Sequence, residues 1–218
     1  MIKPEAQKFW DSPNFKRQQE LIAGPVPWET SEKNAALHRT WVETPLIKEY
    51  LGSTSMRPCV AELGCGVGRM LKEFVGEFHC AGLDISDNML KKAEKYLEKY
   101  PKNEMMLGLI KDGVLPLDDD SVNFLYSFLV FQHIQTKAEI GKYMEEISRV
   151  LVPGGYFRVQ TLKGEPHSEE HFGGFHGRFY PSLEDFKTDL DGQCGLEVVE
   201  QEEGLGHPYW LWLTLRRR

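Results

Sequence analysis

The chain has 218 residues, with 33 acidic and 26 basic side chains and a formal net charge of −7 at pH 7. Its length suits one domain with a full hydrophobic core, and 41% apolar with 27% charged residues is ordinary for a globular protein. This balance disfavours wholesale disorder, a fibrous repeat and a dedicated nucleic-acid binder, which normally carries a basic surplus.

The targeting and redox signals are those of a cytoplasmic protein. No apolar stretch approaches the ~18 residues of a membrane helix, and residues 1–10 lack the apolar core of a signal peptide. No CxxC pair occurs, and the cysteine spacings match no zinc pattern. We therefore expect a cytoplasmic protein with reduced thiols at Cys59, Cys65, Cys80 and Cys194.

The first 55 residues are expected to form an N-terminal helical cap, followed by a main domain over 56–218. Pro25, Pro27 and Pro45 interrupt the helical pattern of this segment. Its aromatic residues suit a lid over a ligand and packing onto the main domain equally well.

From residue 58 onward, strand-like and helix-like segments alternate. Short apolar runs predict strands at 58–63, 80–85, 105–110, 122–130 and 156–162. Apolar residues at helical spacing predict helices at 67–78, 87–100, 136–151 and 181–190. This order indicates a mostly parallel sheet with helices on both faces, an α/β fold. Two last strands are predicted at 196–200 and 209–215. The segment between them is too short for a parallel crossover, so they should pair antiparallel and complete seven strands.

A glycine-rich turn separates the first strand from the first helix. Gly64, Gly66 and Gly68 permit positive φ and let a ligand approach the backbone at the carboxyl edge, where open α/β sheets bind ligands. The spacing is GxGxG: no GxxxxGK[ST] run exists, and Arg69 stands where a dinucleotide fingerprint has its third glycine. Asp84, ending the second strand, can accept both hydroxyls of a ribose, which fits NAD or another adenosine cofactor.

Four motifs taken together resemble the class I S-adenosylmethionine-dependent methyltransferases over roughly residues 58–215. They are the turn VAELGCGVG at 60–68, the strand end GLDIS at 82–86, KDG with LPL at 111–117, and RVLVPGG at 149–155. The resemblance implies a Rossmann-like fold, S-adenosyl-L-methionine as cofactor, and methyl transfer by in-line displacement. Asn123 departs from the acidic residue common in the family, and we expect it to affect strand capping alone.

The resemblance also implies a role for each matching residue. The glycines should approach the methionine part, and Glu62 should support the turn or meet the cofactor's amino group. Asp84 should hold the ribose hydroxyls, with Ile85 and Met89 against the adenine. Asp112 should accept from the adenine amino group, with Gly113 beside it. Arg69 either pairs with the cofactor carboxylate or is a solvated residue of the first helical turn. The implied cofactor-binding set is Glu62, Gly64, Cys65, Gly66, Gly68, Arg69, Asp84, Ile85, Met89, Asp112, Gly113, Ser127, Phe128 and Leu129.

Methyl transfer from a sulfonium mainly requires alignment, and it needs a base only where the nucleophile must lose a proton. His133, after the fourth strand, is the candidate base, with fixing of its loop as the alternative role. Residues 167–180 hold three histidines, but their glycines indicate a loop rather than a metal-binding helix, so no metal is expected. The candidate substrate contacts are Trp28, His38, Trp41, His176 and Arg178.

The acceptor is expected to be a small molecule methylated at O, N or C. No [DN]PP[YFW] or Pro-Cys follows the fourth strand, which by resemblance disfavours methylation of amino groups on bases or glutamine and covalent C5 methylation. The strongly acidic stretch 164–204 would repel RNA. A protein or peptide methyltransferase and a non-catalytic cofactor-binding protein stay open, and the oligomeric state is not indicated by the sequence.

Overall fold

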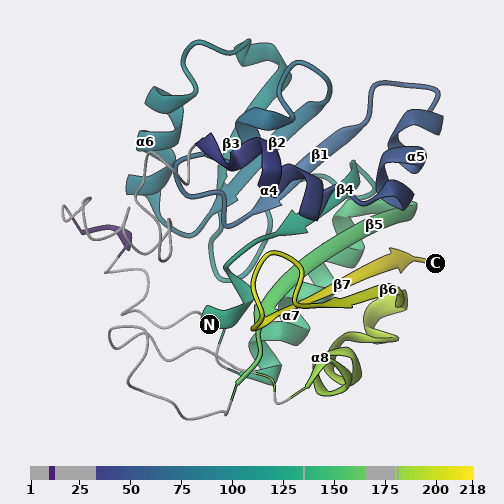
Figure 1. Cartoon of the computed structure of the whole chain (residues 1–218). Helices are drawn as coiled ribbons and strands as arrows, with labels where there is room; N and C mark the ends of the chain where they lie inside the picture. The colour runs from purple at the N-terminus through teal and green to yellow at the C-terminus, as the bar shows by residue number, and fades with distance from the viewer. Residues whose placement is uncertain (1–9, 13–32, 135, 165–179, 181) are drawn as a thin grey trace.

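Seven strands form one open sheet in the computed structural model, which describes residues 10–12, 33–134, 136–164, 180 and 182–218 (Figure 1). The order across the sheet is β3-β2-β1-β4-β5-β7-β6. Strands β1 to β5 are parallel, whereas β7 runs antiparallel to both β5 and β6. The predicted α/β class and antiparallel closing pair are confirmed. The strands are β1 Cys59–Leu63, β2 His79–Asp84, β3 Met105–Leu109, β4 Val122–Ser127, β5 Leu151–Leu162, β6 Leu196–Glu203 and β7 Trp210–Arg217.

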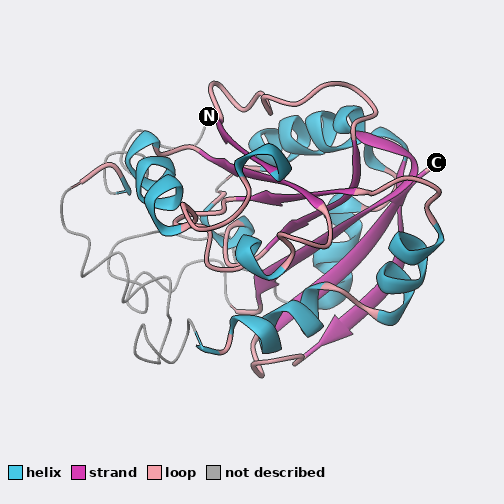
Figure 2. Cartoon of the chain, turned by 90° about the horizontal axis from the view of Figure 1, so that it is seen from above, coloured by secondary structure: helices cyan, strands magenta, loops and turns pink. Residues whose placement is uncertain are grey.

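Helices cover both faces of this sheet (Figure 2). One face packs against α4, α5 and α6, and the other against α7 and α8. Because β1 and β4 lie between these layers, their side chains are nearly all buried, which explains their continuous apolar sequences. The helices are α4 Ala35–Val42, α5 Pro45–Ser53, α6 Asp87–Tyr96, α7 Lys137–Val150 and α8 Leu183–Leu190.

Side-chain caps fix where most of these helices begin. Thr136 forms a capping box with Glu139 at the start of α7, and Ser86 accepts from Met89 N at the start of α6. Pro45 separates α4 from α5, as expected, and it occupies the first turn of α5, where its missing N–H is not needed. Asn123 Oδ1 accepts a hydrogen bond from the amide of Cys59 at 2.9 Å, consistent with the expected strand-capping role.

The helix predicted over 67–78 is absent, and turns with a single 3₁₀ segment at Leu71–Glu73 take its place. Gly68 and Gly76 have φ of 80° and 97°, outside the helical region, and the bond from Glu73 N to Met70 O spans only three residues. The apolar spacing nevertheless describes the packing, because Leu71 and Phe74 are fully buried.

The fifth strand begins earlier than the sequence pattern predicts. It starts at Leu151, directly after α7, and continues through the Pro-Gly-Gly segment to Leu162. Gly154 has φ of 81°, and the pairing with β4 changes register across this segment. The Pro-Gly-Gly motif therefore forms an irregularity inside the strand rather than a stop after the helix.

Among the described helices, none is long and apolar enough to cross a bilayer. All four cysteines are free thiols, and only Cys194 is exposed.

A buried arginine connects the end of α4 to the sheet. Arg158, in the middle of β5, donates from Nη2 to the carbonyl of Trp41 at 3.2 Å and from Nη1 to Thr214 Oγ1 at 2.8 Å. It also pairs with Glu202 and lies over the ring of Trp212, 4.9 Å from the centroid. Because carbonyls in the last turn of a helix lack partners within it, Arg158 fixes the position of α4 on the sheet.

Replacing Arg158 by Met should lower the free energy of unfolding by about 3 kcal/mol, because it leaves the Trp41 carbonyl unpaired beneath the helix. Urea unfolding followed by circular dichroism measures this loss. The matched control is Arg216→Met in the neighbouring strand β7, where the side chain is exposed and a change of less than about 0.5 kcal/mol is expected. Equal losses in the two variants would contradict the anchoring role.

Candidate functional site

The turn after β1 is held against the end of β2 by the Asp84 carboxylate. Asp84 Oδ2 accepts from Gly66 N at 2.8 Å, and Oδ1 accepts from Ser86 N at 2.9 Å. Burial raises the pKa of Asp84 to about 6, against the lowering effect of these two donors. The predicted ribose-binding carboxylate therefore stands at the carboxyl edge, beside the glycine turn, as the sequence indicated.

The glycines of this turn are required by packing as well as by backbone conformation. Gly64 and Gly68 have φ of 79° and 80°. A Cβ on Gly64 would overlap the Val130 side chain, and one on Gly68 would lie 2.5 Å from Leu97 Cδ1. The turn therefore approaches its neighbours as closely as only glycine allows. The adjacent Cys65 is buried, and burial raises the pKa of its thiol.

A second carboxyl group, that of Glu62, lies buried beneath the turn. The hydroxyl of Tyr126 donates to Glu62 Oε2 at 3.1 Å. Burial raises the pKa of Glu62 to about 8, and the charge of nearby Arg69 opposes that rise only in part. The carboxyl is therefore mostly protonated at neutral pH, and it is poised to ionise if a cation is placed beside it.

Arg69 joins the glycine turn to the N-terminal cap. It is 4% exposed, which is inconsistent with a solvated residue, one of its two predicted roles. Its Nη1 donates to His38 Nδ1 at 2.7 Å, and since guanidinium has no acceptor, His38 must accept at that nitrogen. Burial and the Arg69 charge lower the pKa of His38 to about 4, so the imidazole is neutral at pH 7.

An aromatic cluster follows β4 at the same edge. The ring of Phe128 lies 5.6 Å from that of His38, 5.1 Å from Trp210 and 5.6 Å from Trp212, measured between centroids. Trp41 contacts Trp210 at 5.5 Å. The sequence placed His38, Trp41 and Phe128 near the site but missed the two tryptophans of β7, whose WLW pattern is typical of any amphipathic strand.

The chain bends sharply where it leaves β4. Ser127 Oγ donates to the carbonyl of Leu63 at 3.1 Å, which connects the ends of β4 and β1. Leu129 has φ of 62°, a conformation rare for leucine, and its N–H donates to Gln160 Oε1 at 2.9 Å. Such backbone strain concentrates at functional sites. Gln160, fully buried in β5, was not among the predicted residues.

The predicted adenine contacts occupy the loop after β3. Asp112 and Gly113 have φ of 53° and 81°, and Lys111 and Val114 pair on either side of them. Two successive positive φ values between paired residues define a tight two-residue turn of type I′. Asp112 is exposed at its tip.

The other predicted adenine contacts and an unpredicted acid lie at the start of α6. Ile85 is half-buried and Met89 is buried. Asp11, from the N-terminal segment, accepts from Ser86 Oγ at 2.6 Å and so reaches the beginning of this helix. No sequence signal identified Asp11.

The candidate base His133 lies in a 3₁₀ turn at Phe131–His133, after β4. Its Nε2 is 3.4 Å from Gln132 Nε2, and burial lowers its pKa to about 4. His133 is therefore neutral at pH 7 but only weakly basic.

Part of the predicted site lies outside the described residues. This concerns Trp28, His176 and Arg178, as well as the two other histidines of the 167–180 segment. Within the described residues, no group of three or more His, Cys, Asp or Glu side chains is placed to hold a metal ion.

Comparison with known families agrees with this geometry. The profile of one family, described as "Methyltransferase domain", matches residues 61–159, from β1 into β5. Residues 61–159 therefore contain a methyltransferase domain, and the seven-stranded sheet has the Rossmann-like methyltransferase fold. The match includes the glycine turn, Asp84, the Asp112 turn and His133.

The relatives differ in what their names say they methylate. "Probable tRNA methyltransferase 9B" of Homo sapiens is 27% identical over 129 residues, which cover 59% of this chain and 26% of the relative. "Sterol 24-C-methyltransferase" of Debaryomyces hansenii is 30% identical over 118 residues, covering 51% of this chain and 31% of the relative. The chain thus spans only 26% and 31% of the length of these curated relatives.

Similarity to solved structures extends over the whole methyltransferase fold. Geranyl diphosphate C-methyltransferase from Streptomyces coelicolor, in complex with Mg²⁺, geranyl-S-thiolodiphosphate and S-adenosyl-L-homocysteine, has a TM-score of 0.71. The similarity covers 99% of both chains at 12% sequence identity, so it concerns the fold alone.

Asp84→Ala and Gly66→Val should each abolish binding of S-adenosylhomocysteine. The first change removes the carboxylate that holds the turn and that the resemblance assigns to the ribose. The second places a branched side chain on a residue with φ of 53°. Isothermal titration calorimetry measures the affinity. Asp87→Ala, an exposed acid three residues along, is the control and should bind normally. Unchanged affinity in both site variants would contradict the assignment of this edge.

Binding of S-adenosylhomocysteine should release a proton from Glu62. The free carboxyl has a pKa of about 8, and a cofactor ammonium beside it favours the ionised form, so affinity should rise with pH up to about 8. Calorimetry in buffers of different ionisation enthalpy measures the proton release at pH 7. Glu62→Gln should remove it, whereas Glu98→Gln on the surface should not. Binding by the unmodified protein without proton exchange would contradict this role.

Proposed function

We propose that this chain transfers the methyl group of S-adenosylmethionine to a small-molecule acceptor. The observation that carries the proposal is the pairing of Asp84 with the glycine turn at the carboxyl edge of the sheet. Two carboxyl groups and a turn that only glycine can form suit a ligand with a ribose, an ammonium group and a thin, extended chain. The aromatic cluster around Phe128 adjoins the same edge.

The residues present fit this cofactor. Asp84 would accept from the ribose hydroxyls, Asp112 from the adenine amino group, and Glu62 from the ammonium group. Arg69, whose charge interacts with that of Glu62, would face the cofactor carboxylate. When bound, S-adenosylmethionine supplies a methyl group on a sulfonium that is already activated for displacement. The chain then needs mainly to align an acceptor atom with that methyl group and to exclude water.

Neither described histidine near the site is a strong base. His38 and His133 each have a pKa near 4, well below the operating range of an efficient general base at neutral pH. We therefore assign His38 to orienting Arg69 and His133 to fixing the loop after β4. An acceptor that needs no deprotonation, or one already ionised, fits this arrangement.

The aromatic cluster favours an acceptor with apolar surface. Trp41 and Trp210 are only partly buried, and Tyr209, next to Trp210, is 61% exposed. Such rings bind apolar or flat molecules through large contact areas. One sequence relative, named for a sterol, acts by name on a molecule of this kind. That name supports the class of acceptor.

Charge gives the main argument against the rival RNA acceptor, which the tRNA methyltransferase relative suggests by its name. The net charge of −7 repels a polyanion. Several arginines that could contact phosphates are already ion-paired: Arg39 with Glu77, and Arg57 with Glu104. The acidic stretch is itself partly paired, for example Glu197 with Arg218 and Glu203 with Lys163, so its repulsion is weaker than the sequence suggested.

Labelled S-adenosylmethionine incubated with the protein and a cell extract tests the proposal. The label should enter the small-molecule pool with the unmodified protein and not with Asp84→Ala. Label in RNA or in protein would show another acceptor class, and tight cofactor binding with no transfer to any pool would favour a non-catalytic role. Once the acceptor is known, near-normal turnover of His133→Ala would agree with the loop-fixing role.

A further inference from the structure

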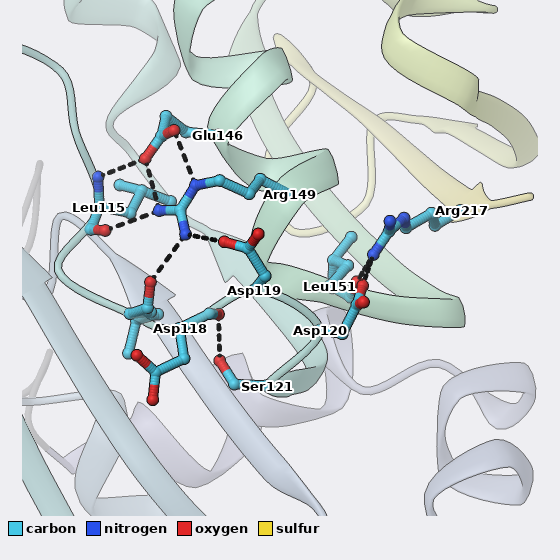
Figure 3. Close-up of polar contacts among 10 residues, drawn as sticks. Leu115, Asp118, Asp119, Asp120, Ser121, Glu146, Arg149, Leu151 and Arg217 are labelled. Atoms are coloured by element: carbon cyan, nitrogen blue, oxygen red, sulfur yellow. Dashed lines mark hydrogen bonds and ion pairs between the residues drawn. The ribbon is translucent and has the colours of Figure 1, made fainter.

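Arg149, in the last turn of α7, forms hydrogen bonds with the segment that follows the Asp112 turn (Figure 3). It donates from Nη2 to the carbonyl of Leu115 at 2.9 Å and from Nη1 to that of Leu117, also at 2.9 Å. Nη1 also pairs with Asp119 at 2.7 Å, and Nε and Nη2 bind the two oxygens of Glu146 at 2.9 Å and 2.7 Å. All five N–H donors of the guanidinium are therefore used.

Glu146, from the same helix, binds this segment as well. Its Oε2 accepts from Leu115 N at 2.9 Å while it holds Arg149. Both backbone groups of Leu115 are thus fixed by one Arg–Glu pair. The loop is restrained further along by Arg217 of β7, which contacts both Asp120 and the carbonyl of Leu151 (Figure 3).

Leu115, the first residue bound by Arg149 and Glu146, lies two residues after the Asp112–Gly113 turn. On the other side of the turn, Ile110 N donates to the backbone carbonyl of Asp84 at 2.8 Å, so that stem is fixed as well. Pro116 packs so closely on β3 that a Cβ on Gly108 would lie 2.6 Å from its Cγ. A two-residue turn has little conformational freedom, so the position of Leu115 sets the position of Asp112.

We propose that Arg149 and Glu146 are positioning residues for recognition of adenine: by fixing Leu115 they hold the Asp112 carboxylate where the amino group of the base is bound. This inference rests on the proposed function, because it takes Asp112 as the adenine partner. Lysine cannot replace arginine here, since a single ammonium cannot reach two carbonyls and two carboxylates in one plane.

The test compares two probes, S-adenosylhomocysteine and S-inosylhomocysteine, which carries an oxygen in place of the adenine amino group. The unmodified protein should prefer the first by about tenfold or more, the worth of a hydrogen bond to a charged acceptor. Arg149→Lys should reduce that preference to within about threefold, as should Asp112→Ala. Calorimetry gives both dissociation constants, and a purely structural role would not change their ratio.

Arg57→Lys is the matched control. Arg57 also binds two carbonyls, those of Glu77 and Phe78, together with the carboxylate of Glu104, but at the amino edge of the sheet. Its side chain is 31% exposed and that of Arg149 is 30% exposed, so the two changes should cost similar stability. The control should lower the melting temperature and keep the preference between the probes.

A second variant, Glu146→Gln, keeps the test possible if Arg149→Lys misfolds. It preserves side-chain size while weakening the hydrogen bond to Leu115 N. It should reduce the preference in the same direction. A preference unchanged in folded Arg149→Lys or Glu146→Gln, or unchanged in Asp112→Ala, would overturn this inference alone. Failure of the unmodified protein to bind S-adenosylhomocysteine would overturn the proposed function and the inference with it.

Discussion

The carboxylate of Asp84 is the contact on which the rest of the binding edge depends. It holds the glycine turn through Gly66 N and the start of α6 through Ser86 N, while its backbone carbonyl receives Ile110 N. Three loops, which follow three different strands, are thus attached to one residue. Its burial is the energetic cost of this position, visible in a pKa raised to about 6. A ligand at this edge meets loops whose relative positions are already set.

Arginines then connect the helices to these loops. Arg69 joins the glycine turn to His38 of α4, Arg158 joins the end of α4 to β5, and Arg149 joins α7 to the loop after β3. Loops at the edge of an open sheet expose backbone carbonyls that no strand satisfies, and guanidinium can satisfy several of them in one plane. The same chemistry therefore fixes the N-terminal cap and the loop after β3, although the elements involved are far apart in the sequence.

Much of the fold followed from local pattern. Each predicted strand from β1 to β7 exists, and three of the four motifs lie at the carboxyl edge of the sheet, as expected. The fourth, RVLVPGG, lies at the start of β5, at the opposite edge. The helix predicted at 67–78 was wrong because apolar spacing reports burial, and the positive φ of Gly68 and Gly76 excludes a continuous helix there. The early start of β5 was missed because Pro-Gly-Gly is typical of a stop, whereas here it forms an irregularity within the strand.

The residues that sequence reasoning missed come from elements brought to the site by the order of strands. Trp210 and Trp212 reach Phe128 because β7 inserts between β5 and β6. Gln160 supports Leu129 from the neighbouring strand, and Asp11 reaches α6 from the far end of the chain. None of these residues lies in a motif, so no local signal could identify it.

From sequence alone came the α/β class, the glycine turn and the acidic end of β2, because apolar period and glycine spacing are properties of neighbouring residues. The tertiary structure decided which charges are free and which are engaged. Arg69 is buried against His38, Arg149 is saturated by its loop, and part of the acidic surplus is paired. Burial and pairing depend on which segments become neighbours in space, and that information is spread over the whole chain.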